Sequence, residues 1–167
     1  MTETAPAISK PGKQDSAERV RAYLESYGLA DAIFTFEQST KTAQMAADAM
    51  GCELGQIVKS LVFVVDDRPV LALVAGDRRG DTGAIAALLG GKKASFADAD
   101  TVREATGYAI GGVSPFDLPE ELFVLVDDSL GRFEIVYPAA GTPSSMVKMT
   151  LGRLLEITGG AVESVAR

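Results

Sequence analysis

Two runs of apolar and β-branched residues, separated by a short polar turn, constrain the fold of this chain more than any other feature. The runs are Ile57–Val65 and Val70–Ala75, and the turn between them is Asp66–Pro69. Runs of this length around turn-forming residues are typical of a β-hairpin, whose strands are antiparallel. The sequence therefore predicts a sheet with at least one antiparallel pair.

Helical and strand segments alternate along the rest of the chain. Helices are predicted, from their spacing, composition and end signals, at Asp15–Tyr27, Thr42–Met50, Asp81–Leu89, Asp98–Thr106 and Leu151–Thr158. Further strands are predicted at Ile33–Phe36, Ala94–Phe96, Leu122–Asp127, Phe133–Tyr137 and Ser145–Met149. This order predicts a mixed α/β (α+β) fold, in which helices pack outside a mixed sheet.

The length of 167 residues favours a single domain, which we expect to span residues 15–167. Residues 1–14 contain Pro6, Pro11 and Gly12 and no apolar core, so we expect a disordered lead-in rather than a signal peptide. No stretch of the sequence reaches the roughly 18 apolar residues that a membrane span requires. The chain is therefore not expected to interact with a membrane.

The composition excludes several kinds of catalytic site. The chain has no His, so it cannot form a Ser-His or Cys-His pair or a His-ligated zinc or haem site. Its one cysteine, Cys52, cannot form an internal disulfide or a cysteine metal cluster, and we expect no metal, no cofactor and a cytoplasmic location. The net charge of −7 argues against an extended nucleic-acid surface but permits a local basic pocket.

Lys59 interrupts the apolar pattern of its strand. With a period of two residues, it shares a face with Ile57, Leu61 and Phe63. A lysine among large apolar side chains either extends its amino group to the edge of the sheet or binds an anion. The pattern alone leaves both interpretations open.

The segment Gly107–Phe116 is rich in glycine and contains Gly111 and Gly112. A tight turn between two elements would explain it. Alternatively, the glycines let main-chain N–H groups approach a ligand and stabilise an oxyanion. The segment matches neither a phosphate-binding Walker loop nor a dinucleotide-binding motif. A second loop of small residues, Ala140–Ser145, also fits a turn, although its hydroxyl groups could bind a ligand.

Several segments together resemble the YbaK family, the free-standing relatives of the editing domain inserted in bacterial prolyl-tRNA synthetase. The resemblance rests on Thr42–Gly51 followed by Ile57–Phe63, then on Gly76–Asp81, on the Gly111-x-x-x-Pro115 loop and on Gly141. These segments occur in the family's order, and the resemblance covers about Ser16–Gly160.

The resemblance implies a partly barrel-like sheet surrounded by helices and the hydrolysis of aminoacyl-tRNA esters. It implies that Lys59 holds the phosphate backbone at the tRNA 3′ end and that the Gly111–Pro115 loop faces the aminoacyl group. Catalysis would depend on a positioned water, backbone groups and the ribose hydroxyl of the substrate. The synthetase-inserted domains carry a His where this chain has Gly141–Ser145, so the amino-acid specificity stays open.

We therefore predict a trans-editing hydrolase that deacylates mischarged aminoacyl-tRNA, such as tRNA-Pro or a related tRNA, with a synthetase as a further partner. The predicted catalytic residues are Lys59, Gly111 and Gly112, and the predicted substrate-binding residues are Ser114, Pro115, Gly141, Thr142, Ser144 and Ser145. One alternative is a non-catalytic module of the same fold that binds tRNA or a synthetase. Another is an esterase for small molecules.

Overall fold

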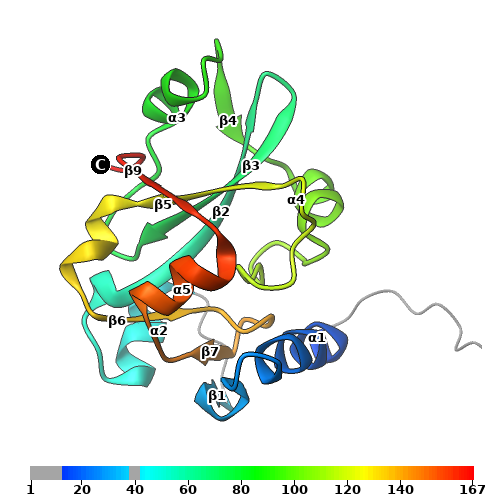
Figure 1. Cartoon of the computed structure of the whole chain (residues 1–167), viewed down its shortest axis with the longest axis vertical. Helices are drawn as coiled ribbons and strands as arrows, with labels where there is room; N and C mark the ends of the chain where they lie inside the picture. Colours follow the sequence, from blue (N-terminus) through cyan, green and yellow to red (C-terminus); the bar gives the residue numbers. More distant parts are fainter. Residues whose placement is uncertain (1–12, 38–41) are drawn as a thin grey trace, which may run out of the picture.

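The computed structural model describes residues 13–37 and 42–167, in which five α-helices surround a curled mixed sheet (Figure 1). The helices are α1 (Lys13–Glu25), α2 (Ala43–Met50), α3 (Thr82–Leu88), α4 (Ala99–Thr106) and α5 (Leu151–Thr158). Helix α1 begins two residues before its predicted start, so Lys13 and Gln14 are helical. The rest of the predicted lead-in, residues 1–12, lies outside the described residues. No helix within the described ranges is long and apolar enough to cross a membrane.

The main sheet has the order β8-β6-β2-β3-β5-β9, and β4 pairs with β2. Its strands are β2 (Ile57–Val65), β3 (Arg68–Ala75), β4 (Ala94–Phe96), β5 (Phe123–Asp127), β6 (Ile135–Pro138), β8 (Met149–Thr150) and β9 (Ala161–Glu163). Strands β2 and β3 are antiparallel, whereas β2 with β6, β3 with β5 and β5 with β9 are parallel. The predicted mixed, partly barrel-like fold is therefore confirmed.

The predicted hairpin is present, but its turn is shorter than predicted. Only Asp66 and Asp67 lie between the strands, and both have positive φ (46° and 72°). Two positive φ values are characteristic of a two-residue hairpin turn that follows the twist of its strands. Pro69 belongs to β3 and faces Val64 in the ladder. A proline is tolerated there because it lies at the start of the strand.

The C-terminal strands differ most from the sequence-based expectation. The predicted strand Ser145–Met149 is two strands: β7 (Ser145–Val147) pairs with β1 (Ile33–Thr35) in a separate small sheet, and β8 pairs with β6. Strand β9 was not predicted, and it completes one edge of the main sheet beside β5. These strands are short, and their partners are distant in sequence, so local patterns carry little information about them.

Buried apolar side chains lie on both faces of β2 and β3. Val58 and Val62 contribute to the core that also contains helices α1 and α5. Phe63 and Val65 contribute to a second core, with α3. Neighbouring residues of a strand point to opposite faces of the sheet. The side chains between Val58 and Val62 therefore point alternately toward one core and toward the other.

Candidate functional site

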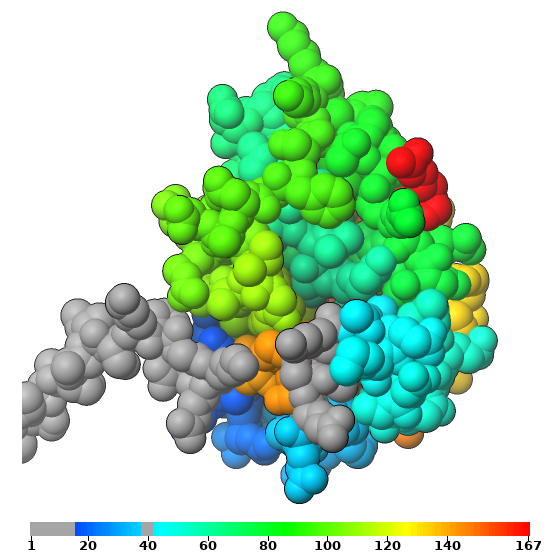
Figure 2. All heavy atoms as spheres, turned by 180° about the vertical axis from the view of Figure 1, so that it is seen from behind, coloured from blue at the N-terminus to red at the C-terminus, as the bar shows by residue number. Residues whose placement is uncertain are grey.

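A recess of about 280 Å³ lies beside β2, on the face shown in Figure 2. In that view the blue-green strand is visible between the yellow-green loop that follows α4 and the cyan helix α2. Most of the side chains that line the recess are apolar or small, and three of the predicted site residues are among them: Lys59, Gly111 and Thr142. The recess thus joins three segments that are far apart in the sequence.

Lys59 is half-buried on β2, and its amino group reaches the loop that follows β3. Its Nζ donates a hydrogen bond to the carbonyl oxygen of Arg78. Burial lowers the pKa of Lys59, the negative charge of Asp77 opposes this change, and the positive charge of Arg79 lowers the pKa further. Lys59 makes no ion pair within the described part of the chain. Its charge is therefore available to an anion.

The carboxylate of this loop whose charge acts on Lys59, that of Asp77, is already paired. Both oxygens of Asp77 accept hydrogen bonds from the guanidinium of Arg132, at 2.8 and 2.9 Å. This contact lowers the pKa of Asp77 and fixes the loop against the segment after β5. A bidentate contact of this kind fixes the orientation of the carboxylate, because both of its oxygens are bound. Lys59 therefore bonds to a main-chain carbonyl of this loop, while the Asp77 carboxylate is bound to Arg132.

The two adjacent glycines of the loop after α4 have different environments. Gly111 is exposed, has φ of +89° and borders the recess. We find no hydrogen bond from its N–H to the described residues. Gly112 is buried, and its N–H donates to the carbonyl oxygen of Ala109 at 2.9 Å. Of the two predicted oxyanion donors, Gly111 alone has an N–H that is available to a ligand in this conformation.

The predicted residues Ser114 and Pro115 do not border the recess. The Ser114 side chain is buried, and its hydroxyl donates to the carbonyl oxygen of Ala139 at 2.8 Å, which joins the glycine loop to the end of β6. Pro115 borders a second hollow, with Tyr23 and Leu118, next to α1. In the structure these two residues support the loop rather than face the recess.

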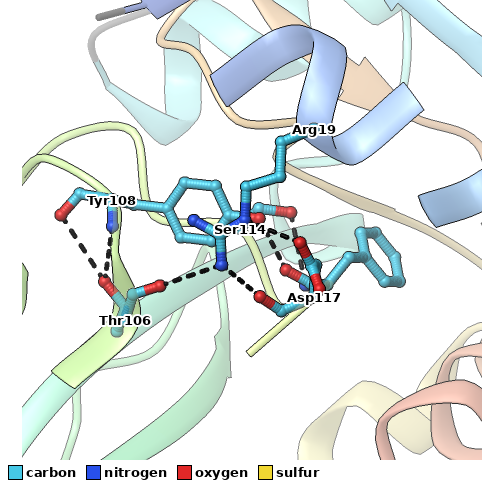
Figure 3. Close-up of polar contacts among 6 residues, drawn as sticks. Arg19, Thr106, Tyr108, Ser114 and Asp117 are labelled. Atoms are coloured by element: carbon cyan, nitrogen blue, oxygen red, sulfur yellow. Dashed lines mark hydrogen bonds and ion pairs between the residues drawn. The ribbon is translucent and has the colours of Figure 1, made fainter. Parts of the chain in front are cut away.

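Arg19 of α1 fixes the same loop from the other side (Figure 3). Its Nε donates to Asp117 Oδ2 at 2.7 Å, and its guanidinium also donates to the carbonyl oxygens of Thr106 and Asp117. The guanidinium lies 4.3 Å from the ring centre of Tyr108. Burial raises the pKa of Tyr108 to about 12, and its hydroxyl donates to the carbonyl oxygen of Phe116 at 2.6 Å. Both ends of the loop are thus attached to α1.

The loop Gly141–Ser145 contributes one hydroxyl-bearing residue to the recess, Thr142. Its Oγ1 lies 2.7 Å from Ser145 Oγ and accepts a hydrogen bond from the Ser144 N–H at 3.2 Å. Ser144 and Ser145 are not among the residues that border the recess. Gly141 has φ of +98°, and a Cβ there would lie 2.6 Å from the carbonyl oxygen of Ser16 in α1. The loop thus requires glycine at position 141 for its packing against α1.

Sequence reasoning did not select several residues that border the recess. Phe96 and Ile110 are more than half exposed at its mouth, and Ser60 and Pro143 lie along it. An aromatic residue at the end of a short predicted strand was a usable sequence signal for Phe96. Ser60 had no such signal, because a serine in a strand is common.

The described residues contain no group of three or more His, Cys, Asp or Glu side chains that could hold a metal ion. The described residues that border the recess include no carboxylate, and Lys59 is the one charged residue among those described. Such a site can bind a phosphate and a small acyl group and can offer a main-chain donor to a carbonyl oxygen.

Comparisons with known proteins agree with this chemistry. A family model described as "Aminoacyl-tRNA editing domain" matches residues 37–157. The chain is 35% identical over 144 residues to the uncharacterized protein YwhH of Bacillus subtilis. This match covers 86% of this chain and 91% of that protein. It is 32% identical over 139 residues to the multifunctional Ser/Thr-tRNA deacylase ProXp-y of Escherichia coli, covering 80% of this chain and 83% of that protein.

The fold is also similar to solved structures. A proposed trans-editing enzyme for prolyl-tRNA synthetase aligns with a TM-score of 0.83 and 38% identity and covers 99% of both chains. The hypothetical protein APE2540 aligns with a TM-score of 0.80 and 29% identity, over 89% of this chain and 99% of that one. The resemblance inferred from the sequence is confirmed, and the chain belongs to the aminoacyl-tRNA editing domain family.

Proposed function

We propose that the recess beside β2 is where this editing hydrolase cleaves the ester between an amino acid and the 3′ adenosine of a mischarged tRNA. The family model and the similarity to named deacylases support the reaction class. The observation that carries the assignment of the site is Lys59, which has no ion-pair partner in the described chain and is the one charged residue among the described residues that border the recess. Lys59 binds a backbone phosphate near the 3′ end and thereby places the ester in the recess.

The reaction needs a donor for the ester carbonyl and a water molecule. The N–H of Gly111 donates to the carbonyl oxygen as negative charge develops on it. Water adds to the carbonyl carbon, the bond to the ribose oxygen breaks, and the proton lost by water goes to that oxygen. Because the described residues bordering the recess include no carboxylate and the chain has no histidine, the neighbouring ribose hydroxyl assists this proton transfer. Thr142 and the loop Gly141–Ser145 close one side of the recess.

The size of the recess and the names of the relatives support a narrower class of substrate. A volume of about 280 Å³ fits a small aminoacyl group. One relative is named a Ser/Thr-tRNA deacylase and another a Cys-tRNA(Pro)/Cys-tRNA(Cys) deacylase. The substrate is therefore a tRNA, tRNA-Pro or a related one, that carries a small amino acid. Prolyl-tRNA synthetase is the expected partner, and such a reaction takes place in the cytoplasm.

A panel of mischarged tRNAs tests the proposal, with the release of each amino acid followed over time. We expect Lys59→Ala to reduce deacylation about 10- to 100-fold, since a hydrogen bond to a charged group contributes roughly 1.5–3 kcal/mol. Lys92→Ala is the matched control, because Lys92 is exposed and does not border the recess.

The other two functions give different results in the same assay. A non-catalytic binding module would bind the charged tRNAs without releasing any amino acid. A small-molecule esterase would hydrolyse simple amino-acid esters as fast as the tRNA esters and would not respond to Lys59→Ala. Either result would overturn the proposed function.

A further inference from the structure

Strand β2 has an open edge where it borders the recess. On one side β2 is paired with β3 along almost its whole length. On the other side it pairs with β6 only at Ile57 and Val58 and with β4 only from Phe63 to Val65. No strand of the described chain pairs with this edge between these two points. The residues from Val58 to Val62 span about 13 Å at the rise of a β-strand.

The structure shows why the two flanking strands leave this gap. Strand β6 ends at Pro138, and the next residue, Ala139, forms a bridge to Met146 rather than to β2. Strand β4 ends at Phe96, after which the Ala97 N–H makes a last bond to the carbonyl oxygen of Val62, at 3.0 Å. Both neighbours therefore turn away from β2 before they meet.

The direction of the main-chain groups at this gap follows from the register. In an antiparallel ladder, alternate residues direct both their N–H and their C=O to the same edge. Ile57 directs its carbonyl oxygen to β3, where it accepts from Gly76, and Val62 directs its own to the β4 side. Ser60 has the parity of Val62. Its N–H and C=O therefore point into the gap, at the edge that borders the recess.

The side chain of Ser60 is also unsatisfied. Its Oγ is the one buried side-chain oxygen or nitrogen atom in the described part of the chain that has no hydrogen-bond partner. A buried polar group without a partner is costly and is rare in folded proteins. The main-chain N–H and C=O of Ser60 thus have no strand partner at the open edge, and its buried hydroxyl has none either. The two main-chain groups at the edge can pair with a polar ligand.

We propose that the open edge of β2 binds the aminoacyl group of the substrate as a strand one residue long, with Ser60 as its partner. This inference rests on the proposed function. In an extended amino acid the α-amino group and the carbonyl oxygen point to the same side, as they do in a strand residue. The amino group donates to the Ser60 carbonyl oxygen, and the ester carbonyl accepts from the Ser60 N–H.

This arrangement gives the ester carbonyl two main-chain donors, Ser60 on β2 and Gly111 on the opposite loop. It also explains how a recess whose described lining has no carboxylate selects aminoacyl esters, since a main-chain carbonyl recognises the amino group. The amino group keeps N–H donors in both of its protonation states. Lys59 precedes Ser60 in the strand, so consecutive residues hold the phosphate and the aminoacyl end.

Hydrogen exchange of the backbone amides, resolved by NMR, tests the inference directly. In the free protein the Ser60 amide should exchange faster than those of Lys59 and Leu61, which are paired with β3. Saturation with a tRNA that carries alanine through a 3′-amide bond, which the enzyme cannot hydrolyse readily, should slow Ser60 exchange at least about tenfold. The matched control is a tRNA with a 3′-amide-linked propionyl group, which lacks the amino group and should slow Ser60 exchange less.

Turnover provides a second readout of the same contact. After correction for spontaneous hydrolysis, deacylation of propionyl-tRNA should be about 10²-fold slower than that of alanyl-tRNA, since the Ser60 carbonyl loses its donor. A Ser60 amide that is protected in the free protein, or not slowed by the alanyl analogue, would overturn the inference. So would equal turnover of the two esters. If the protein still deacylated mischarged tRNA at a normal rate, those results would overturn the inference and leave the proposed function standing. Conversely, the alanyl analogue could slow exchange of the Ser60 amide in a protein that deacylates no mischarged tRNA. That result would overturn the proposed function alone.

Discussion

Arg19 and Asp117 are 98 residues apart in sequence, and their side chains meet at 2.7 Å on the outer side of the glycine loop. The contact joins α1 to the segment that carries Gly111. Asp117 has φ of 56°, a conformation that a residue other than glycine adopts only when its surroundings hold it. The guanidinium supplies that support through three hydrogen bonds and through its contact with the Tyr108 ring.

We expect Arg19→Ala to lower both the stability and the turnover number. The pair is partly exposed, with 31% and 45% of the side chains accessible, so the ion pair itself contributes little. The lost carbonyl contacts and the ring contact together suggest about 1–2 kcal/mol of unfolding free energy. Thermal melting measures the first effect, and steady-state kinetics on a mischarged tRNA measure the second.

Arg153→Ala is the matched control for this prediction. Arg153 also pairs with a carboxylate, Glu156, donates to a carbonyl oxygen, that of Tyr27, and lies over an aromatic ring. It does not touch the glycine loop, so it should lower the melting temperature without lowering the turnover number. Equal effects of both variants on turnover would show that Arg19 acts only through stability.

We expect Gly111→Ala to reduce the rate far more than the stability. A Cβ at position 111 would contact nothing within 4 Å, so the positive φ is the one source of strain, about 1 kcal/mol. A shift of the Gly111 N–H away from the ester carbonyl would cost about 10²–10³ in rate, as the loss of an oxyanion donor does. Gly90→Ala is a close control, because Gly90 has φ of +67° and open surroundings but lies at the end of α3. A similar activity for both variants would remove the Gly111 N–H from the mechanism.

Gly141→Ala should destabilise the protein strongly. Its Cβ would lie 2.6 Å from the Ser16 carbonyl oxygen and 2.9 Å from a methyl group of Val20, and a backbone atom cannot move aside cheaply. Overpacking of this kind costs about 1–3 kcal/mol in addition to the strain of a positive φ. Gly28→Ala carries the strain alone, since Gly28 has φ of +74° and open surroundings. Denaturant titration of both variants should show a clearly larger loss for Gly141→Ala, and equal losses would contradict the predicted clash.

The sequence was most informative where local signals coincide. Helix α4 is capped by Asp98, whose side chain accepts from the Thr101 N–H, and ends at Gly107 with positive φ, as its pattern predicts. The same holds for α5 between Thr150 and Gly159. Capping residues and left-handed glycines act within one turn of the helix, so their effect is visible in the sequence.

The open edge of β2 is a property of pairing between distant strands, and no local pattern reveals it. Lys59 was noticeable because a charge interrupts an apolar run, and in the structure its amino group reaches the loop after β3. Ser60 is informative only once β6 is known to end at Pro138 and β4 at Phe96. Likewise, Gly112 is equivalent to Gly111 in sequence, and only the turn to Ala109 distinguishes them.

As the pH rises, substrate binding should begin to weaken at a lower pH than it would if the phosphate were held by an exposed lysine. Burial lowers the pKa of Lys59 from the ordinary 10.5, so its amino group loses its charge, and with it the phosphate contact, earlier as the pH rises. The affinity for a 3′-amide-linked aminoacyl-tRNA should therefore fall as the pH rises through this lowered pKa. Lys59→Arg should bind with a flatter pH dependence, because a guanidinium stays charged throughout the accessible range. Titration of the tRNA bases affects both proteins alike, so the difference between the two profiles isolates Lys59. Superimposable profiles of wild type and Lys59→Arg would show that the charge of Lys59 does not hold the substrate.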